Sequence, residues 1–481
     1  MRLRGRLDNE RFRAGVVRAR RTARIWRLTV RNGLRYAGHR ARRVVVRDDT
    51  RRAEMDTRFT IRSSDDVARE LGQMKGALMK FGQLLSFIVE ALPEEAQHSL
   101  ASLQSNAPPM APEVAAKVVL EELGKPPEKA FLDWDPVPVA AASVGQVHRS
   151  VSRDGRDVAV KVQYPGVGAA IEGDLDNAQA LYRLFTAFAL KGLDAKALVD
   201  ELRARMRDEL DYCIEARNQR EFAAHYAGHP FIHIPEVVAA TSTRRVLTSE
   251  WVDGIDFAEF RNVADDAARR RAGESIWRFA QASVHHLGAF NGDPHPGNYK
   301  FERNGTVTFL DFGLVKRWTH GEWERLEPSL DAIVVHRDPE RLVAAMEAVG
   351  FLRCGHGLPD QDVYDYVSAP YLPYLSDEFT FTRSFVREAM QRIIDVKGPY
   401  ADVINRLNMP VSFVILDRVV WGVSAILGKL EVAGPWRGML LEYRTGGPPA
   451  TPMGAAEQAW VAARPGADPA VVRFEHHDPR H

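Results

Sequence analysis

Two carboxylates and one asparagine, close together in the second half of the chain, have the residue types that phosphoryl transfer requires. Asp293 and Asn298 enclose the sequence Asp-Pro-His-Pro-Gly-Asn, and Asp311 follows in the triplet Asp-Phe-Gly. Asn298 and Asp311 could bind Mg²⁺ together, because this hard cation prefers oxygen ligands. Asp293 could then orient or deprotonate an attacking hydroxyl group. Each piece alone also suits an ordinary turn, but the ordered combination predicts a magnesium-dependent phosphoryl-transfer centre.

The elements that must position these residues are those of a protein kinase, whose catalytic loop and metal-binding Asp have the same spacing. Such a site needs a strand lysine for the ATP phosphates, and Lys161 ends the β-prone run Val-Ala-Val-Lys. A helix must supply a carboxylate to hold that lysine. The segment 209–215 has a helical pattern and contains Glu209, Asp211 and Glu215. We expect Glu215 to pair with Lys161 and the other two to serve another purpose.

The hairpin before Lys161 departs from the glycine-rich loop of ordinary kinases. Ala140, Ala141 and Ala142 stand where glycines are usual, followed by Ser143 and Gln146. Each added Cβ restricts the backbone conformations that can wrap around phosphates. We therefore expect the loop to bind the nucleotide, but in a different way. No Gly-Lys-Ser or Gly-Lys-Thr supports a P-loop instead.

An apolar run that ends in Glu250 and Val252 precedes Gly254. Its position between the lysine strand and the catalytic loop indicates the connection between two lobes. There the backbone groups of Glu250 and Val252 would contact the purine. The same residues would also suit a plain strand followed by a turn.

Together these residues resemble the UbiB/AarF group of atypical protein-kinase-like proteins, and the resemblance extends over most of the chain. It includes the alanine-rich loop, Val-Ala-Val-Lys, the Glu-x-Asp segment, Asp-Pro-His-Pro-Gly-Asn and Asp-Phe-Gly. The stretch from Lys75 to Gln83 is similar to the family's Lys-x-Gly-Gln motif. The resemblance implies an α+β, two-lobed protein-kinase-like fold with a family-specific N-terminal helical extension and a mostly helical C-lobe. It also implies that Lys80 and Gln83 face the nucleotide, with Lys80 beside Glu209 or Asp211.

The resemblance implies ATP and Mg²⁺ as cofactors, with Asp293, Lys161 and Lys80 as catalytic residues and with Asn298 and Asp311 as metal ligands. The residues expected around the nucleotide are Ala140, Ala141, Ala142, Ser143, Gln146, Lys161, Glu209, Asp211, Glu215, Gln83, Glu250 and Val252.

The implied activity is that of an ATPase or a small-molecule or lipid kinase in quinone or isoprenoid-lipid biosynthesis. In the family, the Lys-x-Gly-Gln motif occupies the space that a peptide substrate would need. No Ala-Pro-Glu triplet follows Asp311 either, which argues against a serine/threonine protein kinase. The alternative is a nucleotide-switched regulatory or lipid-binding protein without phosphoryl transfer.

Two features around the catalytic loop are unusual. Asn291 stands where the family commonly has His, and we expect it to tune the loop, because an amide can both donate and accept hydrogen bonds. His285, His286 and His295 lack a further ligand at zinc spacing, so we expect them to be structural.

Charge is concentrated at the start of the chain. Residues 1–52 contain 18 arginines and 4 acidic residues. Such a segment could form an amphipathic helix on an anionic membrane, or a disordered or packed arm; nucleic-acid binding is not expected. The two cysteines are too few for a disulfide framework, which predicts a cytoplasmic protein, with peripheral contact to the inner face of the membrane as an option. Val411 to Leu427 is interrupted by Asp417 and Arg418, so we expect an amphipathic C-lobe helix there.

The expected organisation has five parts. They are a basic arm at 1–55, the helical extension at 56–130, the N-lobe at 131–250, the C-lobe at 251–445 and a disordered tail at 446–481.

Overall fold

The computed structural model describes most of the chain from residue 110 to residue 464. The described ranges are 110–142, 144–168, 204, 206–319, 321–395, 398–408 and 411–464. Lys80, Gln83, Ser143 and the basic arm therefore lie outside the described residues.

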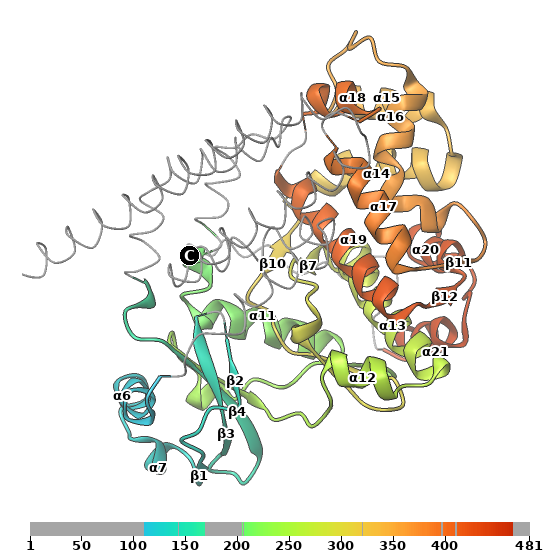
Figure 1. Ribbon diagram of the computed structural model, residues 1–481. Helices are drawn as coiled ribbons and strands as arrows, with labels where there is room; N and C mark the ends of the chain where they lie inside the picture. Colours follow the sequence, from blue (N-terminus) through green and yellow to red (C-terminus); the bar gives the residue numbers. More distant parts are fainter. Residues whose placement is uncertain are drawn as a thin grey trace, which may run out of the picture.

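The N-lobe is an antiparallel sheet in the order β1-β3-β4-β6, with β2 paired to β3 (Figure 1). Its strands are β1 (Asp133–Trp134), β2 (Ala140–Ala141), β3 (Gly145–Val151), β4 (Asp157–Gln163) and β6 (Val246–Glu250). Alternation along β4 buries Val158, Val160 and Val162 in one cluster with Val118 and Val119 of helix α6 (Pro112–Leu123). Lys161 must then project from the opposite face, because side chains alternate along a strand. The short helix α7 (Pro127–Ala130) follows α6.

Helix α11 (Tyr212–His225) starts later than the sequence pattern predicted. Glu209 and Leu210 lie in a turn, and Asp211 is the N-cap, whose side chain accepts a hydrogen bond from the Cys213 amide at 3.0 Å. An aspartate cap satisfies an amide that the first helical turn leaves unpaired. The expectation of one helix through 209–215 was therefore wrong at its start, and Glu215 occupies the first turn instead.

The C-lobe is mostly helical (Figure 1). Its helices are α12 (Phe257–Val263), α13 (Asp266–Ala282), α14 (Glu322–Asp331), α15 (Pro339–Ala348), α16 (Asp360–Val367), α17 (Arg383–Ile394), α18 (Ala401–Arg406), α19 (Val411–Leu430), α20 (Trp436–Thr445) and α21 (Pro452–Ala462). The short strands are β5 (Ile232–His233), β7 (Ala289–Asn291), β8 (Tyr299–Phe301), β9 (Val307–Phe309), β10 (Val315–Arg317), β11 (Phe379–Thr380) and β12 (Ala433–Gly434). Short 3-10 helices occur at η1 (Ala239–Thr241), η3 (Pro296–Asn298) and η5 (Ala369–Tyr374), and π-helical turns occur at η2 (Ser283–Leu287) and η4 (Ala332–His336). Two of the small strand pairs, β7 with β10 and β8 with β9, frame the catalytic loop.

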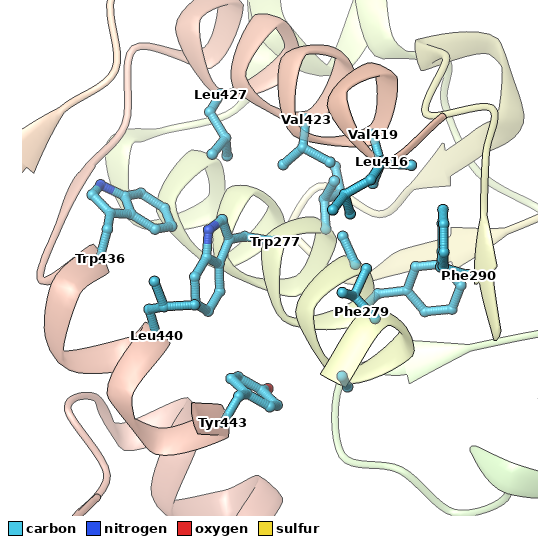
Figure 2. Close-up of a cluster of buried hydrophobic side chains, with 14 of the residues drawn as sticks. Trp277, Phe279, Phe290, Leu416, Val419, Val423, Leu427, Trp436, Leu440 and Tyr443 are labelled. Carbon is cyan, nitrogen blue, oxygen red and sulfur yellow. The ribbon is translucent and has the colours of Figure 1, made fainter. Parts of the chain in front are cut away.

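The C-lobe core lies between α13, α19 and α20. Figure 2 shows Trp277 of α13 between Leu427 of α19 and Trp436 and Leu440 of α20. The predicted helix from Val411 is confirmed as α19, and its residues Leu416, Val419, Val423 and Leu427 face this core (Figure 2). Among the described residues, no helix has the length and apolar character needed to cross a membrane.

The tail contradicts the expectation of disorder from residue 446, because α21 is helical and packs against the C-lobe. Glu457 of α21 is 8% exposed and lies 3.0 Å from Arg278 Nη1, whose side chain is fully buried. Arg278 also pairs with Glu442 at 2.9 Å. The Pro- and Gly-rich composition of the tail predicted disorder. The helix is held instead by an ion pair between distant segments, which composition does not reveal. Residues 465–481 lie outside the described part.

Candidate active site

Lys161 and Glu215 form the centre of the site. Lys161 Nζ lies 2.9 Å from each of the two carboxylate oxygens of Glu215, so the predicted pairing is confirmed. The Oδ2 atom of Asp311 is 3.8 Å from the same nitrogen. The ring of Tyr212 lies 5.1 Å from it, within cation–π range. The strand, the helix and the Asp-Phe-Gly segment thus converge on one ammonium group.

The charges of this cluster do not balance. Burial by itself would lower the pKa of Lys161, but Glu215 and Asp311 outweigh it and raise that pKa, so the lysine stays protonated. The pKa of Glu215 is raised to about 7: burial is the main cause, Lys161 opposes it, and Asp311 and Glu209 add to it. One cation thus faces more than one carboxylate. A bound divalent cation would offset that excess negative charge.

The catalytic loop is closed by hydrogen bonds between its two predicted functional residues. Asn298 Nδ2 donates to the backbone carbonyl of Asp293 at 2.9 Å and to its Oδ2 atom at 3.2 Å. Because the side-chain Nδ2 atom of Asn298 makes both of these hydrogen bonds, its Oδ1 atom is left to act as a metal ligand. Pro296 starts the turn η3, which ends at Asn298.

The donor set fits Mg²⁺. Among the described residues, no group of three or more His, Cys, Asp or Glu side chains could hold a metal ion. Mg²⁺ does not need such a group, because it usually binds one or two carboxylates together with phosphate oxygens and water. The Oδ1 atom of Asn298 and the carboxylate of Asp311 supply that kind of protein contribution.

Asn291 ties the catalytic loop to the Asp-Phe-Gly segment. Its Nδ2 donates to the backbone carbonyl of Asp311 at 2.5 Å, and its Oδ1 accepts from the Asp293 amide at 2.9 Å. Strand pairing of Asn291 with Val315 supports the same junction. Asn291 thus both donates and accepts a hydrogen bond, as expected for an amide at this position, and in doing so it joins the two segments.

The Asp-Phe-Gly segment is held against α11 and the C-lobe core. Phe312 is fully buried, with its ring centroid 5.1 Å from that of Phe222 on α11. Its backbone carbonyl accepts a hydrogen bond from Asn218 Nδ2 at 3.1 Å. The Gly313 amide donates to Asp311 Oδ1 at 2.9 Å, which fixes that carboxylate. Asp311 therefore points toward Lys161 and the catalytic loop.

Gln146 does not belong to the nucleotide site, contrary to the sequence prediction. It is 1% exposed; its Oε1 accepts from the Met110 amide at 2.8 Å, and its Nε2 contacts His148 Nε2 at 2.9 Å. Gln146 pairs in register with Val162, so it shares the buried face of the sheet, whereas Val147 pairs with Lys161. Strand alternation thus turns Gln146 away from the lysine. The period of two in the sequence contained this signal.

The alanine-rich loop lies at the edge of the sheet. Ala140 and Ala141 form β2 and are exposed, and the Ala142 amide donates to the Gly145 carbonyl at 2.8 Å, closing a tight turn. The structure therefore leaves these three alanines accessible to a nucleotide. An added Cβ at Gly145 would overlap the Val162 carbonyl, so glycine is required there.

The connection between the lobes begins where β6 ends at Glu250. The Glu250 amide donates to the Glu236 carbonyl at 2.8 Å, so this amide is not available to a purine. Val252 follows in an irregular segment. The predicted contacts of the Glu250 and Val252 backbone groups with the purine stay a prediction, and at Glu250 the carbonyl is the group that would make the contact.

Glu209 and Asp211 have different environments. Glu209 is 8% exposed and close enough to raise the pKa of Glu215. Asp211 caps α11 and lies 3.9 Å from Arg244 Nε. Glu209 therefore belongs to the charged cluster, whereas the side chain of Asp211 is used by the helix.

The histidines have structural contacts. His295 Nδ1 accepts from the Gly297 amide at 3.1 Å within the catalytic loop. Burial holds the pKa of His285 well below its ordinary value, and its ring stands edge-on to Trp323. His286 lies 3.3 Å from the Tyr443 carbonyl. Among the described residues, these contacts fit the prediction that the histidines are structural.

Arg418 is a site residue that sequence reasoning missed. It lies on α19, and its Nη2 atom contacts Asp293 Oδ1. The two side chains are only 5% and 10% exposed. The sequence showed Arg418 merely as an interruption of an apolar helix, because 125 residues separate it from Asp293. A charged residue inside an otherwise apolar helical face was the available signal.

An antiparallel N-lobe sheet, a helical C-lobe and a lysine–glutamate pair beside two metal-ligand candidates define a protein of the kinase-like class. Residues 102–346 match the ABC1 atypical kinase-like domain. The chain belongs to the ABC1 atypical kinase-like family, and the resemblance to the UbiB/AarF group is thereby confirmed.

Its relatives include plant and bacterial proteins. The chain is 34% identical over 288 residues to the Arabidopsis thaliana protein called activity of bc1 complex kinase 1, chloroplastic; the match covers 57% of this chain and 41% of that protein. It is 30% identical over 309 residues to an uncharacterized protein of Mycobacterium tuberculosis, covering 60% and 61%. A Mycobacterium tuberculosis protein solved in complex with erythromycin is similar in structure, with a TM-score of 0.57 and 31% identity over 77% of this chain and 93% of that chain. Matches to the first curated relatives span 41%, 43% and 50% of their length.

Proposed function

We propose that this chain binds Mg-ATP between its lobes and transfers the terminal phosphoryl group to water or to the hydroxyl group of a small lipid-like molecule. One observation carries the proposal: Lys161 Nζ is held 2.9 Å from both oxygens of Glu215 and 3.8 Å from Asp311. In protein kinases this ion pair and the metal-binding Asp must both be in place before turnover. This arrangement supports a catalytic role for the site.

The roles of the residues follow from their atoms. Lys161 would bind phosphate oxygens as a point charge, and Glu215 would fix its direction. Mg²⁺ bound by Asn298 and Asp311 would offset the negative charge that develops on the transferring group. Asp293, held by Asn298 at 2.9 Å and 3.2 Å, would orient the attacking hydroxyl group or accept its proton.

We further propose an isoprenoid or quinone lipid as acceptor or regulator, at the inner face of the membrane. The resemblance to the UbiB/AarF group supports a role in quinone or isoprenoid-lipid biosynthesis. The 18 arginines in residues 1–52 support contact with anionic lipid headgroups.

The test is phosphate release from Mg-ATP by the full chain, with and without vesicles that contain anionic phospholipid. Asp311→Asn should abolish the release, because it removes a metal ligand. Vesicles should raise wild-type release if the membrane proposal is right. A variant as active as the wild type would overturn the assigned role of Asp311.

A second candidate is a regulatory or lipid-binding protein that uses the nucleotide only to change shape. The similar Mycobacterium tuberculosis protein solved in complex with erythromycin favours it, since that complex contains an organic molecule that is not a nucleotide. Mg-ATP binding by the wild type without phosphate release, with or without vesicles, would support this candidate over the first.

A further inference from the structure

Of the two terminal nitrogens of Arg418, one has a hydrogen-bond partner and the other has none. Its Nη2 atom contacts Asp293 Oδ1, whereas its Nη1 atom is buried and has no hydrogen-bond partner in the described part of the chain. The side chain is 5% exposed. A buried guanidinium donor is costly to leave unpaired, and buried polar groups nearly always find partners. The vacant donor beside Asp293 therefore points to a ligand.

The surroundings of Asp293 indicate that this ligand is an anion. The loop from 293 to 298 contains no Lys or Arg, although it must approach the transferring phosphoryl group. In phosphoryl transfer, charge develops on the oxygens of that group, and a cationic donor from the same chain can stabilise it. Lys161 is already held by Glu215 at 2.9 Å on the N-lobe side. Arg418 supplies a positive charge from the C-lobe side.

The backbone of α19 is held close to the loop at this point. Gly422 lies one helical turn after Arg418, and a Cβ added there would overlap the ring of Pro294, the residue after Asp293. Residues four apart share a helix face, so Arg418 and Gly422 both face the catalytic loop. Close packing of this kind fixes the position of the guanidinium group.

We infer that Arg418 is a positioning residue for Asp293 and also binds the terminal phosphoryl group of ATP. The inference rests on the proposed function. Nη2 holds the Asp293 carboxylate, and Nη1 donates to an oxygen of the transferring group. The planar guanidinium presents these two contacts from separate nitrogens in a fixed fork, whereas a lysine has three donors on a single nitrogen and cannot span the same two positions.

Nucleotide selectivity tests the inference without turnover. Dissociation constants of Mg-ADP and of Mg-AMP-PNP, which keeps a terminal phosphoryl group, are measured by calorimetry for the full chain and for Arg418→Lys. The matched control is Arg444→Lys, since Arg444 is also buried, with its side chain 2% exposed, and likewise has an Nη1 atom without a hydrogen-bond partner in the described part of the chain, but its aspartate is Asp331 on α14 and not Asp293. We expect Arg418→Lys to weaken AMP-PNP binding roughly tenfold, the value of one charge-assisted hydrogen bond. ADP binding by that variant, and both constants of Arg444→Lys, should match the wild type.

The rate of phosphate release provides a second test of the role of Arg418. An arginine that contacts the transferring group contributes about 10³-fold or more to turnover. Arg418→Lys should therefore lose about 10³-fold in kcat. The inhibition constant of ADP, measured by competition with ATP, should change little. An unchanged ratio of AMP-PNP to ADP affinity would overturn the inference, since a purely structural Arg418 would not distinguish the two nucleotides.

A pair of variants covers the case in which Arg418→Lys does not fold. Asp293→Asn is compared with Asp293→Asn/Arg418→Gln, which removes both members of the buried ion pair and leaves no uncompensated charge. Weaker AMP-PNP selectivity in the double variant than in Asp293→Asn supports the phosphoryl contact; equal selectivity overturns it. Failure of the proposed function is separate: if the wild type binds both nucleotides without turnover, the affinity ratio still tests Arg418. A wild type that binds neither nucleotide overturns both.

Discussion

Gly422 of α19 packs directly against Pro294 of the catalytic loop. An added Cβ at Gly422 would overlap the Pro294 ring and lie 3.2 Å from the Pro294 carbonyl oxygen. Neither group is the flexible end of a side chain, so the helix or the loop would have to move. The site of chemistry is thus positioned partly by a helix that lies more than 100 residues further along the chain.

We expect Gly422→Ala to lower turnover by about 10²-fold, because displacements near 1 Å at a reacting centre have effects of this size. The measurement is kcat for phosphate release, together with the thermal unfolding midpoint. Gly428→Ala is the control on the same helix, where the new Cβ would lie 3.0 Å from the Thr382 carbonyl oxygen and from Val386, away from the loop. Equal losses of activity in both variants would show that general damage to α19, and not the loop contact, is responsible.

Glu215→Gln should separate catalysis from folding. The amide is nearly isosteric but carries no charge, so Lys161 loses the ion pair that now holds it at 2.9 Å. We expect about a 10²-fold lower kcat, with Mg-ADP still bound. Asp211→Ala is the contrasting variant. It removes the cap of α11 and should lower the free energy of unfolding by about 1 kcal/mol while leaving kcat within twofold. A reversal of these two outcomes would assign the essential carboxylate to Asp211.

Gln146→Ala tests the correction to the predicted nucleotide site. Its loss leaves the Met110 amide without the acceptor that it has at 2.8 Å, and it removes a contact to buried His148. We expect the free energy of unfolding to fall by about 1–3 kcal/mol, measured by urea denaturation. The KM for ATP should stay unchanged. A large rise in KM without loss of stability would restore Gln146 to the nucleotide site.

The parts of the site that the sequence predicted are those with local spacing. Asp293, Asn298 and Asp311 lie within one short stretch, and the strand pattern marked Lys161. The prediction for Gln146 was wrong because it rested on the loop motif, whereas the alternation along β3 places this side chain on the buried face of the sheet. Arg418 left no comparable mark, because its contact with Asp293 depends on how α19 folds back onto the loop.

The same distinction holds for the fold. The two-lobed fold followed from the resemblance that the motifs carry, and the amphipathic helix from Val411 followed from its apolar run with Asp417 and Arg418 inside it. Helix α21 could not be predicted in this way, because the burial of Glu457 depends on its ion pair with Arg278 of α13, which lies 179 residues earlier in the chain. Ion pairs between segments far apart in the chain are set by tertiary packing, which composition cannot show.

The pH dependence of stability should reveal Asp417, the neighbour of Arg418 on α19. Burial raises the pKa of Asp417 to about 7 from an ordinary value of 3.8. Between these values the folded protein keeps a proton that the unfolded chain has released. The neutral form therefore favours folding fully only below the unfolded pKa of 3.8, and this contribution falls steadily as the pH rises from there to about 7.

Asp417→Asn should remove that loss, because an amide stays neutral at every pH. We expect the free energy of unfolding of the variant, relative to that of the wild type, to rise from about pH 4 to about pH 7 and to level off above it, so the variant gains on the wild type between pH 5.5 and pH 8.5. The measurement is urea denaturation at each pH. Glu215, whose pKa burial also raises to about 7, is present in both proteins, so the difference between them isolates Asp417. A difference that stays constant with pH would mean that Asp417 is ionised in the folded protein throughout this range.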